Sequence, residues 1–182
     1  MRIPSRRMPK YTAPTLGWFG KVALVVLMAV LVYVIADASW TKLLVVAIAL
    51  TVLVFFGMRS LKVEQERLQT LAANRFGESI CEFARSFDCR QVDTWVIRAV
   101  YEELQEALPW GTKGFPVRAS DDLNRDLLDN DIEAIEDLIP ILAARTGRSL
   151  TDTESNPYWN KIRTAADLVY FINAQPHVAT SR

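Results

Sequence analysis

The stretch DLLDNDIEAIEDL, from Asp126 to Leu138, is the strongest candidate in the chain for side-chain chemistry. It holds six acidic residues among thirteen. Paired carboxylates such as Asp126 and Asp129 can act as a general acid and base, or hold a divalent cation. The apolar residues between them recur as on one face of a helix, which is also typical of a solvated acidic surface. Because the stretch lacks the glycine and terminal glutamate of a calcium-binding loop, we predict no metal site here.

Other reactive groups are few. Cys81 and Cys89 are the only cysteines, and His177 is the only histidine. His177 lies just after Pro176, in an expected tail, so no histidine remains for a catalytic triad or a dense Cys/His metal cluster. No glycine-rich phosphate loop occurs in a strand-loop-helix setting. We therefore predict no catalytic residue, no metal and no cofactor, and in a reducing compartment we expect both thiols to be free.

The charge is unevenly distributed along the 182 residues, although the net charge is zero. Residues 1–42 carry six basic and one acidic residue, whereas residues 59–182 carry fifteen basic and twenty acidic ones. Nucleic-acid binding needs a clustered basic face, and the C-terminal part is acidic. Nucleic acid is thus excluded as an expected partner.

Two uncharged apolar runs, residues 22–36 and 43–58, account for much of the 51% hydrophobic content. With residues 16–20 extending the first run and Lys21 able to reach the membrane surface, they predict a two-span transmembrane hairpin over residues 16–58, behind a basic tail at residues 1–15. Positive charges flank both outer ends, and only Lys42 lies between the runs. We therefore expect the lipid bilayer of a bacterial inner membrane as a partner, with both termini cytoplasmic. A cleaved signal peptide ending near Ala36-Asp37-Ala38 and a pair of buried core helices remain alternatives.

Residues 59–76 continue in helical register, with Leu61, Leu68, Leu71 and Ala72 on one side. This juxtamembrane segment is either a short coiled-coil stalk, a helix lying on its own domain, or an extension of the second span.

From Gly77 onward, residues 77–182 predict an all-α cytoplasmic domain. We expect a short helix after Gly77 and a longer one capped by Asp93, with Glu102, Glu103 and Glu106 facing water. Two sets of apolar residues should face the core: Ile80, Phe83, Ala84 and Phe87 from the first helix, and Val96, Ile97, Val100, Tyr101, Leu104 and Leu108 from the second.

A long connection over residues 109–130 should anchor in the core through Phe115, Val117, Leu123 and Leu127. The acidic helix that follows should bury its apolar face and end at Gly147, with a kink or early break at Pro140. Thr164 and Asp167 fit a capping box that opens the last helix. The apolar residues expected to face the core from these two helices are Ile132, Ile135, Leu138, Ile139, Leu142, Leu168, Phe171 and Ile172.

Residues 92–175 resemble an acyl carrier protein. The similarity rests on DDLNRDLLDNDIEAIEDL, which resembles that family's loop and second helix, and on KIRTAADLVYFI, which resembles its last helix. The resemblance implies a bundle of one long helix, a long loop, an acidic second helix, a short third and a final fourth. In that family a serine after an aspartate at the start of the second helix carries phosphopantetheine, and Asp131 stands at that place here.

An aspartate cannot take over that serine's role, because its carboxylate would form only a labile mixed anhydride where a hydroxyl forms a stable phosphodiester. We expect Asp131, or Asn130, to cap the helix instead. Our leading hypothesis is a membrane-anchored, non-catalytic, carrier-like module that docks a basic protein partner through its acidic helix. The expected contact residues are Asp129, Glu133, Glu136 and Asp137. The alternatives are a working carrier modified at another serine, and a structural protein that forms homo-oligomers through the hairpin and stalk.

Overall fold

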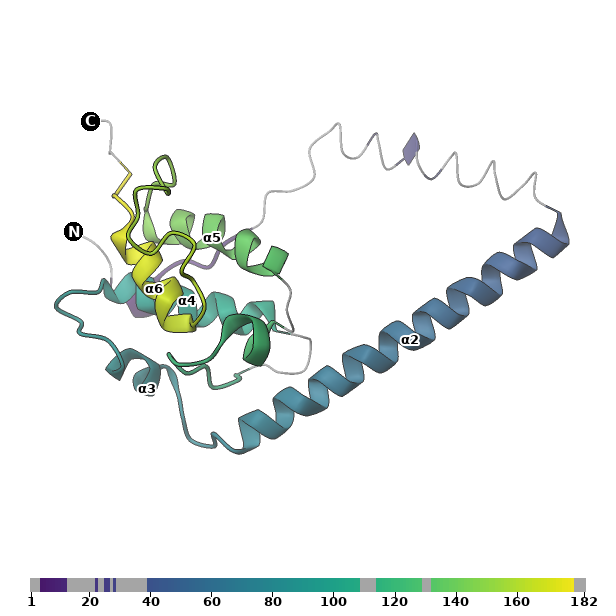
Figure 1. Ribbon diagram of the computed structural model, residues 1–182, viewed down its shortest axis with the longest axis horizontal. Coiled ribbons are helices and arrows are strands. Elements are labelled where there is room, and N and C mark those ends of the chain that lie inside the picture. Colours follow the sequence, from purple (N-terminus) through teal and green to yellow (C-terminus); the bar gives the residue numbers. More distant parts are fainter. Residues whose placement is uncertain are drawn as a thin grey trace. The chain divides into compact units, whose positions relative to one another are not determined.

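A computed structural model describes residues 4–12, 22, 25, 26, 28, 39–108, 114–128 and 132–178. This part of the chain is all-helical (Figure 1). It contains no strand, only two isolated β-bridges, Asp122 with Thr164 and Arg148 with His177. The helical elements are η1 (Ser5–Arg7), α2 (Trp40–Ala73), α3 (Ile80–Arg85), α4 (Thr94–Ala107), η2 (Leu123–Leu127), α5 (Ile132–Thr146) and α6 (Ala165–Ala174).

The chain divides into two compact units. One comprises residues 12–62, and the other comprises residues 1–11 together with residues 63–182. Helix α2 from Leu43 to Ala73 is long and apolar enough to cross a membrane, and the side chains of its apolar window are not buried within the protein. The first apolar run, apart from four isolated residues, lies outside the described residues.

The second apolar run and the juxtamembrane segment as far as Ala73 form one continuous helix of 34 residues, α2. Its last turns belong to the second unit, where Leu68 is fully buried and Leu71 and Ala72 pack against the core. Leu61 is 62% exposed. Of the alternatives for residues 59–76, the end of α2 therefore fits both an extension of the span and a helix lying on its own domain.

Helix α4 is the centre of the second unit and contacts α3, α5, α6 and η1 (Figure 1). Asp93 caps it as predicted, accepting a hydrogen bond from the Trp95 N–H, and all six residues predicted to face the core from α4 and its end are buried. In α3, Ser79 and Glu82 form a capping box, and Phe83 is buried. Phe83 also contacts the rings of Phe87 and Tyr101.

The expectation that Glu102 and Glu103 face water is wrong. Their carboxylates each accept a 2.5 Å bond from the guanidinium of Arg145 on α5. The Arg145 side chain is only 3% exposed, so its charge must be balanced locally. Only Glu106 of the three glutamates is exposed.

The four anchors predicted for the long connection, Phe115, Val117, Leu123 and Leu127, are all buried. The last two lie in η2, a π-helical turn. Helix α5 continues through the exposed Pro140 to Thr146, so the predicted early break does not occur there. Gly147 ends the helix at a φ of +67°, a conformation that favours glycine.

Residues 147–164, where the resemblance implies a short third helix, form turns and extended chain. Helix α6 then opens with the predicted capping box of Thr164 and Asp167. The three residues predicted to face inward from it, Leu168, Phe171 and Ile172, are fully buried.

The N-terminal segment also contributes to the core of the second unit. Met8, which follows η1, is 8% exposed and belongs to the same apolar cluster as the buried face of α4. The neighbouring Arg6, Arg7 and Lys10 are exposed. One apolar residue in a basic tail thus packs into the domain at the other end of the sequence.

Candidate functional site

The residues predicted to contact a partner are only partly described. Asp129 lies outside the described residues, as do Asn130 and Asp131 with their predicted cap. Glu133 lies in α5, but its side chain is not among those described. Glu136 and Asp137 lie on the same helix, are exposed, and have no ion-pair partner in the part of the chain that the structure describes.

Asp121, the first acid of the acidic segment 121–138, is buried. Its carboxylate forms a two-pronged ion pair with Arg75, with N–O distances of 2.7 and 2.8 Å. The Asp121 Oδ2 atom also accepts the Arg118 N–H, and Arg75 donates to the Pro116 carbonyl and lies over the Phe115 ring. This acid therefore holds the long connection against the chain just beyond α2.

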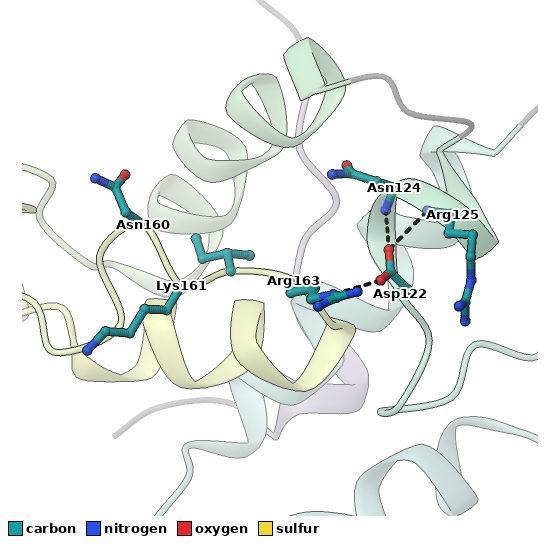
Figure 2. Close-up of a pocket in the computed structure, with 7 residues that line it drawn as sticks. Asp122, Asn124, Arg125, Asn160, Lys161 and Arg163 are labelled. Carbon is teal, nitrogen blue, oxygen red and sulfur yellow. Dashed lines mark hydrogen bonds and ion pairs between the residues drawn. The ribbon is translucent and has the colours of Figure 1, made fainter.

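Asp122 stands in an open cleft of about 620 Å³ between η2 and the segment that leads into α6 (Figure 2). Its Oδ1 atom accepts the N–H groups of Asn124 and Arg125, which caps η2. Its Oδ2 atom accepts the Arg163 Nε–H at 3.1 Å. The Arg125 N–H, then the Arg163 side chain, hold the pKa of Asp122 below its ordinary value.

Asp126 is the third acid of the segment with an arginine partner. The Arg125 guanidinium donates to both of its carboxylate oxygens, at 3.0 and 3.3 Å, and is the main cause that lowers the pKa of Asp126. Asp126 also accepts the N–H of Asp122. Asp121, Asp122 and Asp126 are thus structural residues, and exposed acidic charge remains at Glu136 and Asp137.

The cleft beside Asp122 was not predicted from the sequence. Seven residues line it: Asp122, Asn124, Arg125, Asn160, Lys161, Ile162 and Arg163. Three of these side chains are cationic and one is anionic, although Asp122 belongs to the most acidic segment of the chain. The cleft forms because the two segments pair through their backbones, where the Leu123 N–H donates to the Arg163 carbonyl. No local sequence pattern predicts such a long-range pair, so the sequence held no signal for the cleft.

The remaining candidate groups form no reactive cluster in the described structure. Cys81 and Cys89 are free and exposed. No group of three or more histidines, cysteines or carboxylates among the described residues is placed to hold a metal ion. His177 and Cys89 line a second polar cleft of about 530 Å³ next to the start of α4.

Comparison with protein-family models, with curated proteins and with solved structures finds no match for this chain.

Proposed function

We propose that the protein is a membrane-anchored, non-catalytic interaction module that docks a basic protein partner through the acidic face of α5. The observation that carries this proposal is the contrast between two groups of acids. Asp121, Asp122 and Asp126 are each matched by an arginine, whereas Glu136 and Asp137 extend into solvent from one helix. Exposed charges of one sign accelerate and orient the approach of an oppositely charged surface.

The anchor in this proposal is a two-span hairpin, of which α2 supplies the second span. Support comes from Met8, which precedes both apolar runs yet packs in the same unit as α4, which follows them. A chain that crosses a bilayer twice returns to the side on which it started, so such packing is compatible with two crossings. The basic residues outside the two runs favour the cytoplasmic side of an inner membrane.

The carrier-like part of the proposal rests on the order of elements and on the local sequence. A long helix, a long connection, an acidic helix and a final helix follow one another as α4, residues 108–131, α5 and α6. Asp131 stands where a carrier needs its serine, and a carboxylate cannot hold phosphopantetheine stably. We therefore propose that the domain uses its docking helix without carrying an acyl group.

The experiment compares partner capture by the full-length chain in detergent with capture by Glu136→Lys/Asp137→Lys. A charge-matched control, Glu106→Lys/Glu154→Lys, reverses two exposed acids elsewhere in the domain. We expect the wild type and the control to retain the same salt-sensitive basic protein and the α5 variant to lose it. Equal capture by all three chains would show that the acids serve solubility, and would favour a structural role for the hairpin.

A further inference from the structure

We infer that the cleft between η2 and the segment before α6 binds a phosphate-bearing ligand. The sequence around Asp122 is acidic, but folding brings Arg163 against it, and Lys161 lines the same cleft farther along the segment before α6 (Figure 2). Among the residues that line the cleft, Arg125, Lys161 and Arg163 outnumber the one carboxylate, Asp122. Even when Asp126, which pairs with Arg125, is included, the cleft carries a net charge of three minus two, or +1.

Arg163 provides a fixed anchor for an anion. Its Nε–H is held by the Asp122 carboxylate, which orients the guanidinium, as Figure 2 shows. The side chain is 79% exposed, so its outer N–H groups face solvent. A guanidinium oriented through one edge presents the other as a fork that matches two phosphate oxygens.

Lys161 and Arg125 provide longer arms on either side of this anchor. Lys161 donates to the Pro157 carbonyl at 2.8 Å, a bond to a neutral acceptor that a phosphate can replace with a stronger, charge-assisted one. The Arg125 side chain is 76% exposed. The Asn124 and Asn160 amides add neutral polar groups to the wall, and the Asn124 Oδ1 atom is a buried acceptor without a partner in the described structure.

The test is a titration of the full-length chain in detergent with inorganic pyrophosphate, followed by isothermal calorimetry. Lys161→Ala/Arg163→Ala should weaken binding by about tenfold or more, because hydrogen bonds to charged groups are lost. Arg85→Ala/Arg90→Ala removes the same charge from exposed positions outside the cleft and should leave binding unchanged. Absence of binding by the wild type, or an equal loss in both double variants, would overturn the proposal.

A second variant works in the opposite direction. Asp126→Asn removes the carboxylate that pairs with Arg125 and leaves the Asp122–Arg163 contact in place, so the net charge at the cleft rises and pyrophosphate should bind several-fold more tightly. If Asp126→Asn instead weakens binding as Lys161→Ala/Arg163→Ala does, the cleft does not act as an anion site.

The phosphate can belong to a free metabolite or to a lipid headgroup, and the same titration separates these sources. The chain is placed in nanodiscs of neutral lipid with or without phosphatidic acid. Weaker pyrophosphate binding only in the phosphatidic acid nanodiscs would identify the headgroup as the occupant, and equal binding in both would identify a soluble ligand. This proposal does not rest on the docking function, since Glu136 and Asp137 do not line the cleft.

Discussion

Arg75 and Asp121 are both buried, with side chains 9% and 4% exposed, and their charges meet through two hydrogen bonds of 2.7 and 2.8 Å. The pair joins the chain immediately after α2 to the long connection that precedes η2. Arg67, which lies within α2 near its C-terminal end, donates to the Asp126 carbonyl at 3.1 Å. The end of α2 is therefore held against the acidic segment at two points.

Removing one member of the buried pair should strongly destabilise the domain. Arg75→Ala leaves the Asp121 carboxylate buried and uncompensated, which we expect to lower the free energy of unfolding by about 3 to 5 kcal/mol. The measurement is urea denaturation of the detergent-solubilised chain, followed by circular dichroism. Arg75→Met/Asp121→Leu should recover part of this loss, because neither charge then remains, and a double variant less stable than Arg75→Ala would contradict the argument.

The end of α2 should behave as part of the domain core. Leu68→Ala removes a fully buried side chain, so we expect a loss of about 2 to 5 kcal/mol in the free energy of unfolding. Leu61→Ala, on the same helix but 62% exposed, is the matched control and should change it by less than about 0.5 kcal/mol. Equal effects of the two substitutions in the same denaturation experiment would show that Leu68 does not pack in the domain.

The capping box at the start of α6 gives a smaller and more specific effect. Thr164→Ala leaves the Asp167 N–H without its acceptor, so stability should fall by about 1 kcal/mol. Thr164→Ser keeps the hydroxyl and should stay near the wild type. Thermal unfolding of the three chains measures the difference, and a serine variant as unstable as the alanine variant would indicate that the methyl group matters instead.

The domain should lose stability at acidic pH partly through Asp122. Its pKa lies below the ordinary value of 3.8 in the folded chain, so the unfolded chain takes up the proton first. The stabilisation is therefore present above pH 3.8 and is lost as the pH falls through the lower, folded pKa. Asp122→Asn should show a shallower loss of melting temperature in this window, and parallel curves for the two chains would exclude Asp122 as a contributor.

Local patterns predicted the helices well because their causes are local. Asp93 and Thr164 cap α4 and α6 through neighbouring N–H groups, and the apolar spacing from Val96 to Leu108 follows the helical period. The end of α5 at Gly147 was predictable for the same reason.

The pairing of charges could not be predicted in this way. Arg75 and Asp121 are 46 residues apart, and Arg163 and Asp122 are 41 apart, so their contacts depend on the packing of whole elements. Glu102 and Glu103 fit the exposed positions of α4, but the buried Arg145 pairs with them. The cationic cleft was not predicted because its residues come from two separate segments, an acidic one around Asp122 and a basic one from Lys161 to Arg163.

The burial of Met8 has a consequence for the order in which the protein is made. Met8 leaves the ribosome early, yet the apolar face of α4 that shares its cluster is synthesised only after both apolar runs. Met8 is therefore already present when α4 emerges, and its packing closes a long loop that contains both apolar runs. A bulky affinity tag fused next to Met8 would be tethered close to the core, so the C-terminal end is the better place for one.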